Sequence, residues 1–242
     1  AERVPRLVTA GAVESWVPAI SAQAHKGLRK RLVIVGGAPG MAGAVVLAAR
    51  GAARSGIGMV RLCVAPESLG AVQSAEPTAT AVAWPTDSDA DLAALCDYAD
   101  VMLIGPGLGV TAAAQSLVAR VLVSFRGPVV LDADALSSFA DDPAHLFRAI
   151  RRAGGRAILT PHDGEFARLF PEIARAHARD KLTRARKAAA ASGAVVLLKG
   201  YDTVIAAPDA PAKHSEAAMG AARFSAAPWK PPRSISRANS RT

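Results

Sequence analysis

Hydrophobic residues in this chain fall into short, uninterrupted runs that stop at glycine, proline or charged residues. The first run reads Leu-Val-Ile-Val at residues 32–35 and ends at Gly36. Strands of a parallel sheet that is covered on both faces are apolar at every position, because neither face of the sheet contacts solvent. The same pattern predicts further buried strands at residues 59–64, 80–83, 100–104, 128–131, 157–160, 195–198 and 203–206.

The segments between these runs carry the signals of helices. Residues 42–54 and 89–98 each lead from one predicted strand to the next, and Thr111 stands where a side-chain oxygen can cap a further helix. A charged, alanine-rich stretch at residues 175–192 predicts a long helix that stops at Gly193. Strands alternating with helices predict an α/β fold, a doubly wound and mostly parallel sheet with helices on both faces.

The same pattern divides the chain into three segments. Residues 1–30 form a lead-in, residues 31–208 hold the alternating domain, and residues 209–242 carry prolines, arginines and serines without an apolar period. A segment of this last composition buries too little apolar surface to offset the loss of chain entropy. We therefore predict a disordered basic tail from residue 209 onward.

Charge and composition narrow the functional classes. The net charge is +9, but residues 210–242 hold six basic residues against Glu216 alone, so most of the excess lies in the tail. No basic stripe with interleaved aromatic residues is present, which argues against nucleic-acid binding. No apolar run reaches the ~18 residues of a membrane span, and the first residues lack a signal-peptide pattern, so we expect a cytoplasmic protein. Cys63 and Cys96 are too few for a disulfide framework or a metal cluster.

Glycine-rich loops follow two of the predicted strands. Residues 36–43 read Gly-Gly-Ala-Pro-Gly-Met-Ala-Gly, and residues 105–109 read Gly-Pro-Gly-Leu-Gly. Glycine lets the backbone approach a ligand closely, and the helix after each loop offers free N–H groups to an anion. Neither the dinucleotide fingerprint G-x-G-x-x-G nor the phosphate loop G-x-x-x-x-G-K-[ST] fits these segments.

Ionisable residues follow three other strands. Asp132 and Asp134 could hold magnesium or substrate hydroxyls, or one of them could cap the next helix. His162 is followed by Asp163 and Glu165 in a turn, where it could donate, accept or transfer a proton. Lys199 could act as a point charge for a phosphate or face solvent.

Five motifs in a fixed order carry a family resemblance. They read GGAPGMAGA from residue 36, GPGLG from 105, LDADAL from 131, LTPHDGE from 159 and LKGYDTVI from 198. Over about residues 4–208 the chain resembles the NAD(P)H-hydrate dehydratase family, which is ribokinase-like in fold. The resemblance implies a hydro-lyase that repairs hydrated NADH or NADPH. In this family ADP or ATP, with Mg²⁺, phosphorylates the added hydroxyl, and elimination of phosphate restores the reduced coenzyme.

The resemblance also implies two sets of binding residues. The residues expected to contact the hydrated coenzyme are Ala44, Gly107, Gly109, Asp134 and His162. Those expected to contact the adenine nucleotide are Lys199, Gly200, Tyr201, Asp202 and Thr203. The segment at residues 25–27 resembles the entry to this domain in two-domain bacterial members, so we expect an epimerase domain in a longer parent protein. A homo-oligomer is a separate expectation.

Two departures from the family pattern bear on activity. The usual proline after His162 is Asp163, which adds a negative charge beside an anionic substrate. In the family, the chain continues into a G-x-G-D segment that begins a helix. The start of this helix neutralises the charge of the phosphoryl group, and the Asp activates the accepting hydroxyl. No Gly-Asp pair follows Thr203 in this sequence. We therefore expect a truncated or frameshifted, C-terminally incomplete domain, with the catalytic base and metal ligands unassigned. The alternatives are a non-catalytic coenzyme-binding protein and a ribokinase-like small-molecule kinase.

Overall fold

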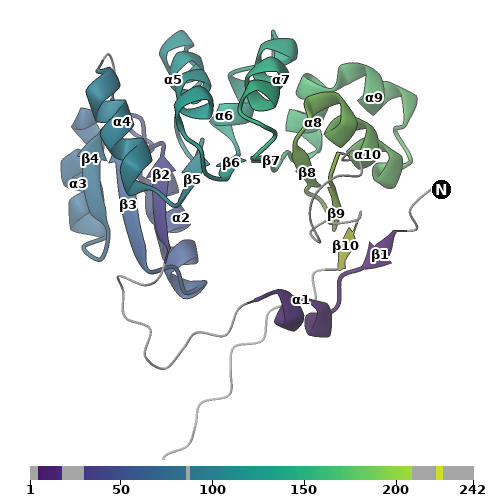
Figure 1. Ribbon diagram of the computed structural model, residues 1–242, viewed down its shortest axis with the longest axis horizontal. Coiled ribbons are helices and arrows are strands. Elements are labelled where there is room, and N and C mark those ends of the chain that lie inside the picture. The colour runs from purple at the N-terminus through teal and green to yellow at the C-terminus, as the bar shows by residue number, and fades with distance from the viewer. Residues whose placement is uncertain (1–4, 18–29, 86–87, 209–221, 226–242) are drawn as a thin grey trace, which may run out of the picture.

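A computed structural model describes residues 5–17, 30–85, 88–208 and, for the backbone alone, 222–225. The strands in this part of the chain form one sheet in the order β1-β10-β9-β8-β7-β6-β5-β2-β3-β4 (Figure 1). Their bounds are β1 Arg6–Leu7, β2 Arg31–Val35, β3 Met59–Val64, β4 Thr80–Ala83, β5 Val101–Ile104, β6 Val129–Leu131, β7 Ala157–Leu159, β8 Val195–Leu198, β9 Asp202–Ala206 and β10 Ala222–Ser225.

Strands β2 to β8 run parallel to one another, and the antiparallel pairs are β8 with β9 and β9 with β10. The connecting helices are α1 Ala10–Trp16, α2 Ala42–Arg54, α3 Leu69–Ala75, α4 Asp89–Tyr98, α5 Ala112–Ser124, α6 Asp134–Ser137, α7 Pro143–Arg152, α8 Asp163–Leu169, α9 Pro171–Ala176 and α10 Lys181–Ser192, with a 3₁₀ turn η1 at Pro66–Ser68. The predicted mostly parallel α/β fold is therefore confirmed.

Two hydrophobic cores occupy the two faces of the sheet. Side chains alternate across a strand, so Ile34 of β2 joins a core with helices α2 and α3, while Val33 and Val35 join the core beneath α4, α5, α6, α7, α8 and α10. Figure 1 shows α5, α6 and α7 side by side along the upper side of the sheet. Helices thus cover both faces where β2 lies, as the apolar runs predict.

The second face is less covered farther along the sheet. The residues of β6, β7 and β8 that alternate with the buried ones are Val130, Ile158 and Leu197, and each is only half-buried. Among the described residues, the helical side chains of the second core come from α2 and α3 alone. The prediction of helices on both faces therefore holds at β2 to β4 and only in part at β6 to β8.

One predicted segment differs from the structure, and another lies mostly outside the described residues. The single helix expected over 175–192 is instead split between α9 and α10, because the Asp180 carboxylate caps α10 by accepting a hydrogen bond of 3.0 Å from the backbone N–H of Thr183. The tail predicted to be disordered contains strand β10, whose Ala222 pairs with Ile205 of β9. The disorder of the tail stays a prediction, because its other residues lie outside the described part of the chain.

None of the helices in the described residues combines the length and the apolar character that crossing a bilayer requires.

Candidate functional site

The sheet has a topological switch point between β2 and β5. From β2 the chain winds outward through β3 and β4, then returns to β5 on the other side of β2 and continues to β8. In open α/β sheets the loops at the carboxyl ends of the two strands at such a point diverge and leave a crevice for ligands. The two glycine-rich segments that the sequence singles out, residues 36–43 and 105–109, both begin at this point.

Backbone hydrogen bonds lock the two loops together. The N–H of Gly37 donates to the Pro106 carbonyl at 3.0 Å, and the N–H of Ala38 donates to the Gly107 carbonyl at 2.6 Å. A Cβ at Gly36 would overlap the carbonyl oxygen of Pro106. Glycine is therefore required here because the two loops touch through their backbones, and we call this contact between the loops the main-chain floor.

Four of the five predicted coenzyme-binding residues lie together at this floor. Gly107 has φ +59, and a Cβ there would stand 3.2 Å from the Cβ of Ala44. The N–H of Gly109 donates to the Asp134 carboxylate at 2.8 Å, which joins the second loop to the start of α6. The alternative that Asp134 caps its own helix is not supported, because Ala133 is the N-cap and makes no side-chain cap bond.

His162, the fifth predicted residue, lies at the end of β7 and begins helix α8. Its Nδ1 accepts hydrogen bonds from the backbone N–H groups of Gly164 at 3.0 Å and Glu165 at 3.3 Å, while the Glu165 carboxylate accepts from the N–H of His162 at 2.8 Å. Because Nδ1 is an acceptor, the ring proton of the neutral side chain lies on Nε2. The side chain is 55% exposed, and its Nε2 lies 3.4 Å from Glu165 Oε1 in the first turn of the helix that it caps.

The extra negative charge of Asp163 is compensated. Its carboxylate accepts a hydrogen bond of 2.7 Å from the Arg184 guanidinium of α10, which also lies 4.7 Å from the centre of the Phe166 ring. The expected repulsion of an anionic substrate is therefore reduced by a neighbouring positive charge. The sequence did not indicate this pair, because its members are 21 residues apart.

Asp132 and Lys199 form an ion pair across the carboxyl edge of the sheet. The Lys199 ammonium donates to Asp132 Oδ1 at 2.6 Å, from the end of β8 to the end of β6, and its backbone N–H donates to the Pro161 carbonyl at 2.9 Å. Both side chains are about one-third exposed, with values of 38% for the lysine and 32% for the aspartate. This ion pair was not predicted from the sequence, because Asp132 and Lys199 were considered separately. The signal that could have indicated the pair is that two opposite charges follow strands of the same sheet.

The predicted nucleotide-binding residues form the tight turn between β8 and β9. Lys181, the first residue of α10, reaches into this turn, where its ammonium donates to the Lys199 carbonyl at 3.1 Å and to the carbonyl of Asp202. A Cβ at Gly200 would collide with the same ammonium. Tyr201 at the tip is fully exposed. The turn is thus held by the first lysine of α10, a contact that the sequence did not indicate.

No group of three or more His, Cys, Asp and Glu side chains suited to a metal ion occurs in the part of the chain that the structure describes. Asp132 and Asp134 follow the same strand, yet each bonds a different neighbour. The possibility that these two residues form a magnesium site is therefore not supported by their contacts.

Comparisons of the fold and the sequence with those of known proteins identify the family to which this chain belongs. The fold resembles that of a ribokinase-like superfamily protein from Enterococcus faecalis, with a TM-score of 0.72 and 21% identity over 92% of this chain and 74% of that one. The sequence profile described as NAD(P)H-hydrate dehydratase matches residues 32–225. The chain belongs to the NAD(P)H-hydrate dehydratase family.

Individual relatives agree with this assignment. The bifunctional NAD(P)H-hydrate repair enzyme Nnr of Moorella thermoacetica is 39% identical over 84% of this chain and 39% of its own length. The ADP-dependent (S)-NAD(P)H-hydrate dehydratase of Neisseria meningitidis is 38% identical over 76% of this chain and 60% of its own length. The ADP/ATP-dependent dehydratase of Bacillus subtilis, co-crystallised with ATP and Mg²⁺, has a TM-score of 0.69 and 30% identity over 86% of this chain and 71% of that one. The chain thus spans about two fifths of the bifunctional relatives.

We expect the variant His162→Asn to lose affinity for hydrated NADPH while keeping its stability. Asparagine retains a side-chain oxygen that can cap α8, but it removes the half-exposed imidazole that we expect to contact the ligand. Leaving a polar partner on the ligand unpaired should weaken binding by about 1–3 kcal/mol. Calorimetry measures the affinity, and His162→Ala, which also loses the cap, should show the same loss together with a lower melting temperature. Wild-type affinity in the Asn variant would remove His162 from the site.

Proposed function

We propose that this chain binds hydrated NADH or NADPH at the switch-point crevice and dehydrates it with ADP or ATP as phosphoryl donor. The observation that carries this proposal is the main-chain floor made by the two locked glycine loops and tied to Asp134 through Gly109. A floor without side chains lets a ligand approach the main chain closely. The start of α2, which makes no side-chain cap bond, favours the ligand's phosphates, whereas Thr111 caps the start of α5. The similarity to dehydratases of this specificity supports the same substrate.

The phosphoryl donor is proposed to bind at the turn between β8 and β9. Tyr201 offers an exposed ring for a nucleotide base. Lys199, the first residue after β8, offers an ammonium group that is bonded to Asp132. Mg²⁺ is usually held through one or two carboxylates together with the phosphates of its nucleotide, so the absence of a three-residue metal cluster among the described residues is compatible with a Mg–nucleotide complex. Asp132 holds the ammonium in place before the nucleotide arrives.

Transfer of the donor's terminal phosphoryl group to the hydroxyl on the hydrated ring makes phosphate a leaving group. Breaking the ring C–O bond then releases inorganic phosphate, with loss of a proton, and regenerates the reduced nicotinamide. Phosphoryl transfer depends on positioning and on neutralising charge. We assign this neutralising role to the Lys199 ammonium, which would contact the phosphoryl group during its transfer.

Removal of this ammonium tests the donor site. The variant Lys199→Met should weaken ADP binding by roughly tenfold to a hundredfold, because a hydrogen bond to a charged group contributes about 1.5–3 kcal/mol. The affinity for hydrated NADPH should change far less. Lys187→Met, on an exposed position of α10, is the matched control. Equal ADP affinities in the two variants would place the nucleotide elsewhere.

The function itself is tested by incubating the purified chain with hydrated NADPH, ADP or ATP, and Mg²⁺. Recovery of reduced-nicotinamide absorbance, with one phosphate released per coenzyme, supports repair. Binding of the hydrate without recovery at any nucleotide concentration would instead identify a coenzyme-binding protein. Accumulation of a phosphorylated product without coenzyme recovery would identify a small-molecule kinase.

The relatives named as bifunctional repair enzymes bear on partners. We propose that the dehydratase unit works beside an epimerase, in a longer parent protein or as a separate chain, and that it acts in the cytoplasm, where both coenzymes are reduced and damaged. Co-purification of an epimerase activity from the source cells would support this arrangement.

A further inference from the structure

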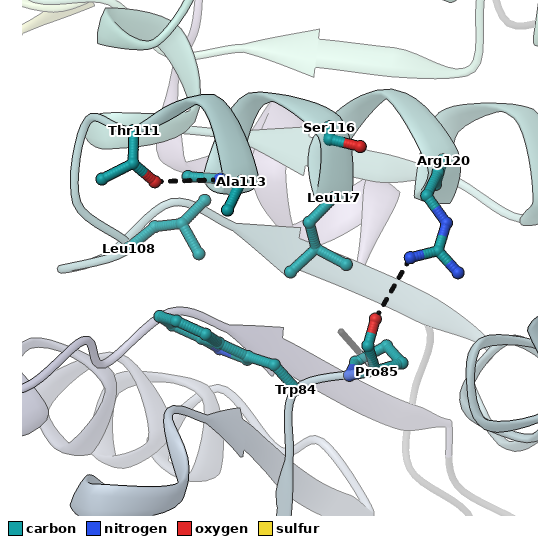
Figure 2. A pocket seen from close by; sticks show the side chains of 9 residues that line it. Trp84, Pro85, Leu108, Thr111, Ala113, Ser116, Leu117 and Arg120 are labelled. Atoms are coloured by element: carbon teal, nitrogen blue, oxygen red, sulfur yellow. Dashed lines mark hydrogen bonds between the residues drawn. The ribbon is translucent and has the colours of Figure 1, made fainter. Parts of the chain in front are cut away.

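A slot lies between helix α5 and the residues that follow strand β4 (Figure 2). Its volume is about 310 Å³, at the lower end of the ~300–1,000 Å³ typical of small-molecule sites, so it fits one part of a ligand rather than a whole dinucleotide. The residues that form its walls include Trp84, Pro85, Leu108, Thr111, Leu117 and Arg120.

The indole of Trp84 is fixed as one wall of the slot. Its Nε1–H lies 3.0 Å from the carbonyl oxygens of both Gly36 and Cys63, to which it donates, and its backbone N–H donates to the Val64 carbonyl at 2.9 Å. Figure 2 shows the ring lying across the slot from Leu108 and Leu117. A flat apolar group can therefore stack on a ring that is already oriented, without any loss of the ring's own hydrogen bonds.

The slot adjoins the main-chain floor made by the two glycine loops. Leu108 lies between Gly107 and Gly109, which form the second glycine loop, and Trp84 donates to the first residue of the other loop, Gly36. A ligand that rests on the glycine loops therefore lies next to the slot. This continuity indicates that the slot and the main-chain floor contact parts of one molecule.

The chemistry of the walls decides which part enters. The charged side chain at the slot is that of Arg120, and its guanidinium already donates to the Pro85 carbonyl at 3.3 Å and to the Asp89 carboxylate at 2.9 Å. The carboxylates, the imidazole and the ammonium of the proposed reaction site follow β6, β7 and β8, on the other side of β5. The reacting ring needs those groups, whereas the far base needs only a surface on which to stack.

We propose that the slot binds the adenine ring of the hydrated dinucleotide, stacked on Trp84, while the nicotinamide end lies toward Asp134 and His162. This inference rests on the proposed function, because it names the place of the non-reacting half of the same substrate. It assigns Trp84 and the face of α5 that carries Ala113 and Leu117 to substrate recognition.

A filled slot provides the test. Ala113 lines the slot and is exposed in the first turn of α5, so Ala113→Phe should occupy the space without disturbing the core. The Kd for hydrated NADPH should rise about tenfold or more, since stacking of a base on an aromatic ring contributes about 1–3 kcal/mol. The Kd for hydrated reduced nicotinamide mononucleotide, which lacks the adenine half, should not change. Ala112→Phe, also exposed but outside the slot, is the matched control.

A second pair of variants probes the ring itself. Trp84→Leu should give the same selective loss, and Trp84→Phe, which keeps an aromatic face, should retain most of the affinity. Equal affinities of Ala113→Phe and Ala112→Phe for hydrated NADPH would overturn the inference alone. So would a selective loss of ADP affinity, because the slot would then hold the base of the donor. Failure of the wild-type chain to bind hydrated NADPH would overturn the proposed function, and the inference with it.

Discussion

The purified chain is expected to bind hydrated NADPH and ADP but to restore the reduced coenzyme about 10²–10⁴ times more slowly than the Bacillus subtilis dehydratase. Phosphoryl transfer needs a base in line with the accepting hydroxyl and donors aimed at the moving group. The family resemblance assigns both to a G-x-G-D segment, and no Gly-Asp pair follows Thr203 in this sequence. Loss of a positioned general base alone typically costs 10²–10⁴ in rate.

We expect that no carboxylate described near the β8–β9 turn acts as this base. The Asp202 side chain lies 3.4 Å from the Lys181 ammonium, which holds it beneath the turn, and Asp209 lies outside the described residues. The measurement is the recovery of reduced-nicotinamide absorbance under saturating substrates, with the Bacillus subtilis enzyme assayed in parallel. A matching rate would show that another group of this chain acts as the base.

The variant Gly105→Ala is expected to destabilise the fold by more than about 4 kcal/mol, a loss reached only by a few mechanisms such as severe overpacking or backbone strain. Gly105 has φ +126, which L-residues rarely adopt, and a Cβ there would overlap the carbonyl oxygen of Asp132 and stand 2.9 Å from the Cβ of Ala135. The backbone has no room to retreat, because the N–H of Gly105 donates to the Val35 carbonyl at 2.9 Å. The clash lies between main-chain segments that position both crevice loops.

Urea unfolding followed by circular dichroism measures this loss, and Gly51→Ala is the matched control. Gly51 lies within α2 with nothing within 4 Å of an added Cβ. Alanine is the better helix former, so this control should gain about 0.5–1 kcal/mol. If Gly105→Ala unfolded at the same urea concentration as the wild type, the close contact between the β5 and β6 loops would be wrong.

Local pattern was enough to place most elements of the domain. The bounds of α2 and α4 agree with the ranges 42–54 and 89–98 that periodicity and breakers predict, and β3 agrees with 59–64. The pattern succeeds here because apolar runs, glycine stops and capping residues act over a few neighbouring positions. It also indicated that glycine, aspartate, histidine and lysine gather at the carboxyl ends of strands, since each of them directly follows an apolar run.

What those residues contact was decided by the tertiary structure alone. The pairing of Lys199 with Asp132 depends on β8 and β6 lying on either side of β7, and the bond from Gly109 to Asp134 depends on β5 lying beside β6. The order of strands in a sheet is set by packing between segments that are distant in the sequence. The periodicity of apolar residues carries no information about such packing. By itself the sequence therefore determined which side chains lie at the carboxyl edge of the sheet. The fold determined which of them make contact, because opposite charges and backbone donors pair through space and not along the chain.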